Sequence, residues 1–322
     1  MFYWEKLAFL GLALTVGAAS AADYPVRPIR FVVPQPPGGG TDIVGRLLAV
    51  KLSESLSQQV VVDNRAGAGG IVGTEMVAKA PADGYTLLLA YTGSMTINPN
   101  IHSKLPYRPL EDFDPVSLAA SSAFVLAMNP GVKANTVQEL IALAKSRAAA
   151  PLNYGSPGNG SLHQLAMEWL RVASGIQLTH VPYKGSQSFN AVMAGEVPMA
   201  FVSLVSSLPH VKGGKAKALA VTSKARSSLL PNVPTMAESS GIADFEAANW
   251  FGVVVPRGTP GPIIAKLSGL VATHMKAPEM KERMLADGGE AIGSTPAEFG
   301  DLMRRELKRW ATVVKMSGAK VE

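Results

Sequence analysis

Three short loops rich in glycine and hydroxyl side chains are the places where this sequence could bind a small molecule. They are residues 36–42, 90–94 and 155–161, called here the first, second and third loops. Each follows an apolar run typical of a buried strand, and the first and third open a helical pattern. Glycine lets the backbone approach a ligand closely, and the free N–H groups at a helix start favour an anion. The pattern predicts an anion held mainly by main-chain donors.

Helix dipoles bind anions weakly, so a useful site needs more than one of these loops. A single dipole contributes only about 0.3–1 kcal/mol, or roughly 2 kcal/mol when partly buried. Two or three loops must therefore converge on one anion. Thr41 or Asp42 could instead simply cap the first helix, and we favour that role for Asp42, because a bare carboxylate would oppose anion binding. The hydroxyls and amides of the second loop could donate to an oxyanion or form an ordinary polar turn.

Other chemistries lack their motifs in this chain. There is no GxxxxGK[ST] sequence, and residues 67–73 place a glycine one position too late for GxGxxG. None of the five histidines pairs with another at metal-ligand spacing, and no GxSxG nucleophile elbow occurs. The absence of cysteine excludes disulfides, thiol catalysis and thiolate metal sites. We expect no cofactor, no metal and no catalysis, with a secreted hydrolase using Ser161 and His163 as an alternative.

Composition and the amino-terminal segment indicate an exported, globular protein. The chain has 322 residues, 47% of them hydrophobic, which suits two lobes better than one core. Residues 1–22 read as a signal peptide: Lys6, an apolar run at 7–16, and small residues that predict cleavage after Ala21 or Ala22. An uncleaved anchor is the alternative, because Glu5 weakens the basic start. The net charge of +6 comes from scattered lysines and arginines, which argues against nucleic acid and suits an anionic solute.

Short apolar strands alternate with amphipathic helices along the whole chain, which predicts an α/β fold with mostly parallel sheets flanked by helices. Expected elements run from a strand at 29–33 and a helix at 41–57 to a final helix at 296–316. Two similar strands closed by proline, at 124–130 and 251–256, read as hinge crossings between lobes. We therefore expect a first lobe made of residues 23–123 and 252–322, and a second lobe made of 124–251.

At the level of motifs, the chain resembles the Bug-type substrate-binding proteins of tripartite tricarboxylate transporters, which are TctC-like. The resemblance covers essentially the whole mature chain. It rests on motifs such as YPVRPI at 24–29, PPGGGTD at 36–42, VDNRAGAGG at 62–70, DGYTLL at 83–88, GNGS at 158–161, VPYKG at 181–185, LPNVPT at 230–235 and WFG at 250–252. It implies a two-lobed periplasmic binding protein of type II-like fold, which closes like a Venus flytrap over a small carboxylate and delivers it to integral-membrane permease subunits.

The resemblance also suggests which residues grip the ligand, through backbone amides, hydroxyls and waters rather than an arginine clamp. It carries over to Pro37, Gly38, Gly39, Thr41, Ser156, Gly158, Gly160 and Ser161, and we add Gln35, beside the site, and Thr92, from the second loop, to the expected ligand-binding residues. Asn64 could contact the ligand or only brace a turn. This chain departs from the family pattern at Gln35, Gln164 and Pro198, which bears on ligand preference.

The role that the resemblance implies is a transport receptor, which we expect to be a monomer. The alternative is a sensor component that binds a similar carboxylate and presents it to a membrane signalling receptor. The sequence does not separate the two roles, because both would need the same ligand-binding loops.

Overall fold

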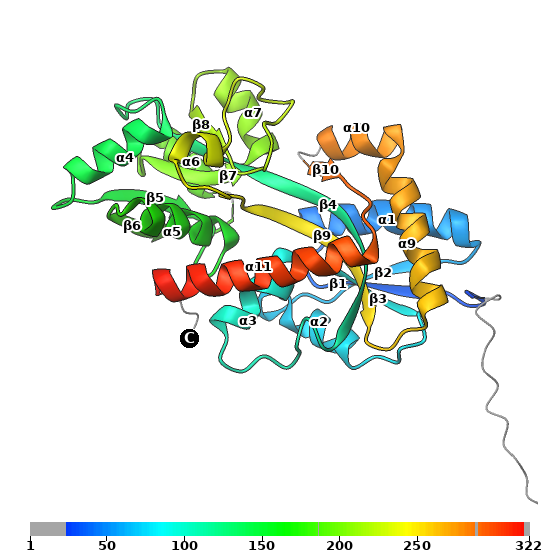
Figure 1. The fold of residues 1–322 in the computed structure, drawn as a ribbon. Coiled ribbons are helices and arrows are strands. Elements are labelled where there is room, and N and C mark those ends of the chain that lie inside the picture. The colour runs from blue at the N-terminus through cyan, green and yellow to red at the C-terminus, as the bar shows by residue number, and fades with distance from the viewer. Residues whose placement is uncertain (1–23, 186, 287–288, 319–322) are drawn as a thin grey trace, which may run out of the picture.

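A computed structural model describes residues 24–318, apart from residues 186, 287 and 288 (Figure 1). The predicted signal peptide lies outside these residues. The strands are β1 Ile29–Val33, β2 Val60–Asn64, β3 Thr86–Tyr91, β4 Phe113–Met128, β5 Leu152–Ser156, β6 Leu178–Pro182, β7 Met199–Ser203, β8 Lys217–Val221, β9 Ala248–Pro256 and β10 Gly289–Ala291.

Helices follow most of the strands. They are α1 Gly40–Leu56, α2 Ile71–Ala78, α3 Asn98–Ile101, α4 Val137–Ser146, α5 Leu162–Ser174, α6 Gln187–Ala194, α7 Leu204–Lys212, α8 Met236–Ser240, α9 Gly261–Lys276, α10 Pro278–Ala286 and α11 Pro296–Ser317. Two short turns, η2 Ala68–Gly70 and η3 Gly93–Ile97, precede α2 and α3.

Two lobes share the long strand β4, which crosses between them beside β9 (Figure 1). In the first lobe, β2, β1 and β3 are parallel, and β9 joins β3 to the start of β4 in antiparallel pairing. In the second lobe, β6, β5 and β7 are parallel, and β7 and β8 flank the end of β4. The outer strands thus form the parallel, helix-covered sheets that the alternating pattern predicted, and the crossing strands add the antiparallel pairs.

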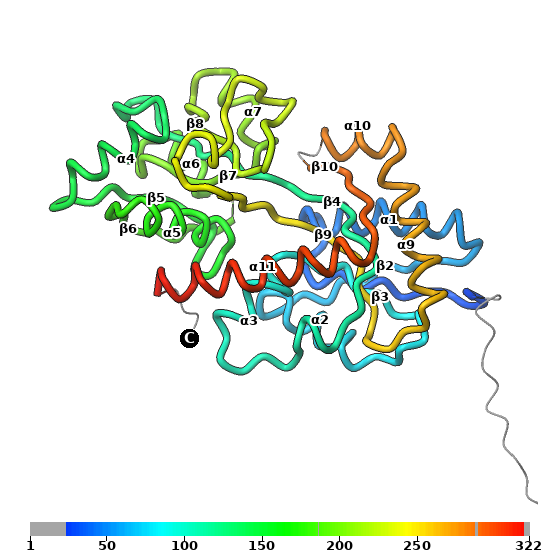
Figure 2. The backbone as a smooth tube through the Cα atoms, in the orientation of Figure 1, coloured from blue at the N-terminus to red at the C-terminus, as the bar shows by residue number. Residues whose placement is uncertain are grey.

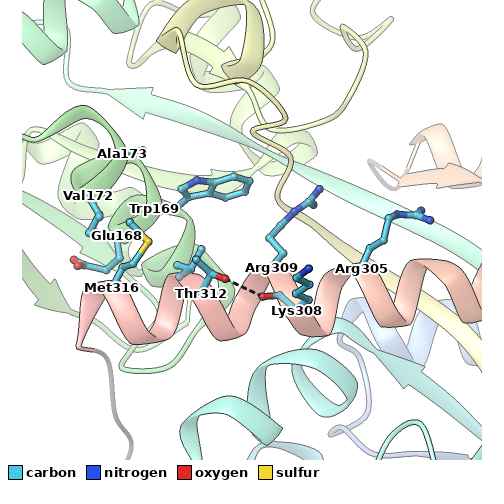
Figure 3. Close-up of a pocket in the computed structure, with 10 residues that line it drawn as sticks. Glu168, Trp169, Val172, Ala173, Arg305, Lys308, Arg309, Thr312 and Met316 are labelled. Atoms are coloured by element: carbon cyan, nitrogen blue, oxygen red, sulfur yellow. Dashed lines mark hydrogen bonds between the residues drawn. The ribbon is translucent and has the colours of Figure 1, made fainter.

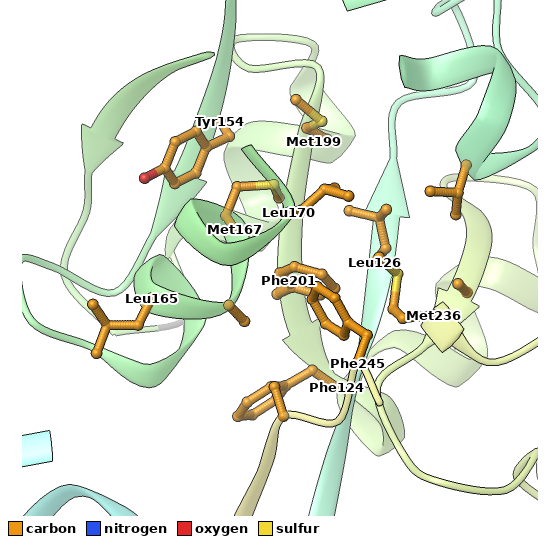
Figure 4. Close-up of a cluster of buried hydrophobic side chains, with 14 of the residues drawn as sticks. Phe124, Leu126, Tyr154, Leu165, Met167, Leu170, Met199, Phe201, Met236 and Phe245 are labelled. Atoms are coloured by element: carbon orange, nitrogen blue, oxygen red, sulfur yellow. The ribbon is translucent and has the colours of Figure 1, made fainter. Parts of the chain in front are cut away.

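The apolar cores lie on the sheet faces, and one of them joins residues of both lobes. In the first lobe, α1 and α9 pack on a face that includes Phe31 and Phe251. In the second lobe, Phe201 and Phe245 lie near the centre of the cluster drawn in Figure 4, with ring centroids 6.3 Å apart. The carboxy-terminal helix α11 runs past both lobes (Figure 2) and contacts η3, β4 and α5. Tight packing in these cores keeps rigid the strand ends from which the loops emerge.

One buried threonine, Thr222, holds together the two chain segments that cross between the lobes. β4 changes partners between Ala123 and Phe124, where pairing with β9 ends and pairing with β7 begins. The Thr222 hydroxyl accepts from the Phe124 N–H at 2.8 Å and donates to the Ala247 carbonyl at 2.5 Å. Thr222 therefore joins β4, where it enters the second lobe, to the segment just before β9, where the chain leaves that lobe.

The structure adds detail at the crossings. Residues 251–256, expected as a hinge crossing, form most of β9, which runs beside β4 between the lobes and pairs there with β3 and β4. Residues 113–122 were missed as a strand, because Pro115 and several serines interrupt their apolar pattern. The division into residues 23–123 with 252–322 and residues 124–251 stays a prediction.

Candidate ligand-binding site

The first loop leads from β1 into a helix whose start has no side-chain cap. Gly39 is the N-cap residue of α1, with φ −83° and ψ 168°, and no side chain bonds to the first turn. Gly38 has φ +84°, a left-handed conformation that favours glycine. Pro37, Gly38 and Gly39 are exposed, whereas Thr41 is buried. The first-turn N–H groups of α1, which no helix can satisfy internally, are therefore available to an anion.

A buried carboxylate braces this loop from behind. Asp42, only 3% exposed, accepts hydrogen bonds from the Gly38 N–H, Arg46 Nε and Asn64 Nδ2, each at 2.9 Å. Asn64 Nδ2 also donates to the Gln35 carbonyl at 3.1 Å. Burial alone would raise the pKa of Asp42, but the hydrogen bonds from these three groups and the charge of Arg46 lower it below its usual value. Asp42 thus stays ionised and holds the loop, with Asn64 as a brace.

Gln35, directly before the first loop, is tied to the neighbouring strand. Its Nε2 donates to the Tyr91 hydroxyl at 2.5 Å, and that hydroxyl donates to the Gly69 carbonyl at 2.6 Å. Asn98 Nδ2 donates to the same carbonyl at 3.0 Å. These bonds join the ends of β1 and β3 to η2, which fixes the position of the first loop against the sheet.

The second loop joins β3 to the crossing. The Thr92 side chain is buried; its hydroxyl donates to the Ala248 carbonyl at 3.2 Å and accepts from the Trp250 N–H at 2.9 Å. Ser94 Oγ bonds back to the Tyr91 backbone. A ligand contact by Thr92 stays a prediction, since the structure shows its hydroxyl engaged with β9 on both its donor and acceptor sides.

The third loop leads from β5 into α5, and its serines bond within the loop. Ser161 is the N-cap residue of α5 and accepts from the Gln164 N–H at 3.3 Å. Its hydroxyl donates to the Gly158 carbonyl at 2.7 Å, while the Gly158 N–H donates to Ser156 Oγ at 3.1 Å. Gly158 has φ +139°, which favours glycine. Ser156 is buried, and Gly158, Gly160 and Ser161 are partly exposed.

A side-chain network behind the third loop fixes the proton on His180. The Gly160 N–H donates to Gln164 Oε1 at 2.7 Å, so the other end of the amide, Nε2, donates to His180 Nδ1 at 3.2 Å. Nδ1 is then an acceptor, and the neutral ring carries its proton on Nε2, 2.6 Å from Ser156 Oγ. Burial lowers the pKa of His180, against the opposing charge of Glu168. His180 therefore donates to Ser156, the reverse of the direction in which a general base acts.

The serine and histidine proposed for the hydrolase alternative do not face each other. Ser161 bonds within its loop, whereas the His163 ring packs at a tilt against Phe124 with ring centroids 4.1 Å apart. Burial lowers the pKa of His163 to about 4. The hydroxyl–imidazole contact in this loop joins Ser156 to His180, and sequence reasoning gave no signal for it.

Both helix starts lie over the same face of the crossing strands. A Cβ placed on Gly40 would lie 3.7 Å from the Phe251 ring, and the Phe124 ring packs at a tilt against His163 in the first turn of α5. Phe251 pairs with Ala120 of β4, and the register shows no shift from Ala120 to Ala123, the residue before Phe124. Side chains alternate between the faces of a strand, so we infer that these aromatic residues share one face. On this inference, one loop from each lobe lies on the same side of the crossing.

Two α/β lobes joined by crossing strands, with helix starts from both lobes on one side, define a periplasmic binding protein. A family model described as "Tripartite tricarboxylate transporter family receptor" matches residues 44–319. The chain belongs to this family. Protein BugT of Bordetella pertussis is 38% identical over 322 residues, which cover 98% of each chain.

Solved structures agree with this assignment. The Rhodopseudomonas protein titled "R. palustris Rpa4515 with adipate" has a TM-score of 0.78 at 34% identity, covering 92% of this chain and 100% of that one. MatC (Rpa3494) from Rhodopseudomonas palustris, solved with bound malate, has a TM-score of 0.74 at 30% identity, covering 90% of this chain and 100% of that one. The expected family and two-lobed fold are confirmed.

Proposed function

We propose that this protein captures a small organic carboxylate between its lobes and delivers it to the membrane permease subunits of a tripartite tricarboxylate transporter. One inference from the strand register carries the proposal: the starts of α1 and α5, one from each lobe, lie over the same face of the crossing strands. Two relatives with the same fold hold adipate and malate, which are dicarboxylates. A ligand that touches both loops would stabilise the closed arrangement of the lobes.

The charges around the loops favour recognition by the main chain. Arg46 pairs with Asp42, and Arg65 pairs with Asp63. These nearby cations already have carboxylate partners, so the donors left to the ligand are the first-turn N–H groups of α1. In the third loop, the Gly158 and Gly160 N–H groups already donate to Ser156 and Gln164. The donors of α1 recognise the carboxylate group itself and leave the rest of the molecule to shape the affinity.

We also propose that the protein performs no catalysis and acts in the periplasm. The tautomer of His180 supports the first statement, because Ser156 receives a proton from the ring rather than losing one to it. Family membership and the predicted signal peptide support the second. In the described part of the chain, none of the helices is both long and apolar enough to cross a membrane. The monomeric state stays a prediction.

The experiment is a thermal-shift panel of mono-, di- and tricarboxylates on the mature protein, followed by titration of the best acid. At about 100 times its Kd, a ligand adds about 2.7 kcal/mol of stability. Gly39→Val should abolish the shift, because Val blocks backbone approach at the start of α1. Gly261→Val is the control, since Gly261 lies one position after the N-cap of α9, whose start also has no side-chain cap, and a Cβ there would meet open space. A panel without any shift, or equal binding by both variants, would contradict the proposal.

A further inference from the structure

A cavity lies between α5 and the end of α11, and its lining includes no residue of the three loops (Figure 3). Its volume is about 390 Å³, within the usual range for sites that bind small molecules. The walls are mainly apolar and come from Trp169, Val172, Ala173, Val313 and Met316. Met316 is 55% exposed although it is a large apolar side chain. The cavity therefore offers apolar surface that the chain's described residues leave open to solvent.

The α11 side of this cavity is basic. Arg305, Lys308 and Arg309 all line it (Figure 3). Arg309 is engaged: it pairs with Glu306, donates to the Glu246 carbonyl at 3.1 Å and lies over the Trp169 ring at 5.5 Å. Arg305 and Lys308 are exposed, and the charge of Arg305 acts on the neighbouring Glu306. Exposed cations and apolar side chains in one lining suit an organic acid with an apolar body.

A chain of contacts joins this cavity to the third loop. Glu168 lines the cavity and accepts from the Tyr154 hydroxyl at 2.6 Å. The Tyr154 ring stacks on His180, with centroids 5.0 Å apart. His180 in turn holds Ser156 through its Nε2. Helix α5 provides a second connection, because it begins at the third loop and its later turns form the cavity wall.

We propose that the cavity between α5 and α11 is a second binding site, for an amphipathic organic acid, and that its occupant changes the affinity of the third loop for the primary ligand. The apolar body lies against Trp169 and Val172, and the carboxylate meets Arg305 and Lys308. Only the coupling rests on the proposed function; binding at the cavity does not. Coupling of this kind is reciprocal, so the primary ligand changes the affinity of the second site by the same factor.

Binding at the cavity is tested by calorimetric titration of octanoate into the mature protein. Octanamide, which has the same chain without the charge, should bind more weakly. Arg305→Glu combined with Lys308→Glu should weaken octanoate binding about tenfold. Lys315→Glu is the matched control, because Lys315 is exposed on the same helix and does not line the cavity. Ala173→Phe, at an exposed position on the α5 wall, should also remove binding by filling the cavity.

These results separate the cavity from the primary site. Octanoate binding that survives Gly39→Val but not Ala173→Phe supports the second site. Binding that is lost in Gly39→Val and kept in Ala173→Phe would place octanoate in the primary cleft and overturn the proposal. No binding by the wild-type protein would overturn it too, whatever the carboxylate panel shows.

Coupling is tested by measuring the affinity of the best acid from the panel with and without saturating octanoate. We expect a change of about fivefold or more. Tyr154→Phe removes the hydrogen bond to Glu168 and should cut this change to less than half while octanoate still binds. Glu168→Gln keeps an acceptor for the Tyr154 hydroxyl, so it should preserve more of the octanoate-induced change in affinity than Tyr154→Phe does. Equal affinities with and without octanoate would overturn the coupling.

Discussion

The first and third loops, which we propose bind the same ligand, are held in place by different groups. The first loop presents a helix start without a cap and is braced from behind by the ionised Asp42. The third loop caps its helix with Ser161 and relies on neutral side chains, in which Gln164 and His180 hold Ser156. An anion-binding bend can thus be stabilised by a buried charge or by a buried neutral network. The two designs should respond to pH in different ranges, which the following predictions use.

The largest expected effect is on the pH dependence of folding stability, and it comes from His163, in the first turn of α5 after the third loop. Its pKa is about 4 in the folded protein and about 6.5 when unfolded, so the unfolded chain binds the extra proton first. The free energy of unfolding is therefore unaffected by His163 above pH 6.5. It falls as the pH drops from 6.5 towards 4, by about 3 kcal/mol in total. His163→Phe should flatten this dependence in urea titrations between pH 7 and 4.5. His102→Gln, which alters a histidine outside the loops, should keep the wild-type slope.

The next effect concerns the brace of the first loop. Asp42→Asn removes the charge and at least one acceptor from a buried site that satisfies Gly38, Arg46 and Asn64, and should cost about 2 kcal/mol. Because the pKa of Asp42 is lowered, the lost stabilisation is present above the unfolded value of 3.8 and disappears as the pH falls through the still lower folded value. The variant should therefore differ from wild type at pH 7 but converge with it at very low pH. Urea titration measures this, with exposed Asp301→Asn as control.

A smaller effect should follow from changing the hydrogen-bonding pattern of the third loop. Gln164→Glu keeps an acceptor for the Gly160 N–H but presents another acceptor to His180 Nδ1. The ring should move its proton to Nδ1, and the pKa of His180 should rise above its wild-type value. Nitrogen chemical shifts of His180 report both changes, and we expect a stability change of about 1 kcal/mol. An unchanged tautomer would show that Gln164 does not set it.

The smallest expected effect tests whether the first loop lacks a cap because it binds a ligand. Gly39→Ser supplies a cap oxygen at a position with suitable backbone angles and open space. It should stabilise the protein by a few tenths of a kcal/mol, while its hydroxyl competes with the ligand for the N–H groups of α1. We expect higher stability together with weaker carboxylate binding in the same titrations. Stronger binding would indicate that the bare helix start has another purpose.

Much of the fold could be predicted because its signals are local. Residues 29–33 and 40–56 form the strand and helix that apolar periodicity indicated, within one residue. The loops between them were found because glycine and proline cluster there. The short α3, α7, α8 and β10 were missed, although α8 begins with a capping box formed by Thr235 and Glu238, which is a local signal.

The site network could not be predicted, because it depends on strand register. Tyr154 pairs with His180 and Ser156 with Pro182 only because β5 and β6 align in one particular way. A shift by one residue would send the His180 ring to the other face. The cavity between α5 and α11 likewise requires two helices that are more than a hundred residues apart in the chain. No motif marks such pairs in a single sequence.

Thr222 holds the two crossing segments together, and this affects how such proteins can diversify. Phe124 and Ala247 bond to the same side chain, so the ends of the intervening segment lie next to each other. Segments with adjacent ends tolerate transplantation, because the recipient need not stretch to receive them. Recombination between relatives could therefore replace residues 124–247 as one cassette, exchanging the third loop in a single event while leaving the first loop untouched.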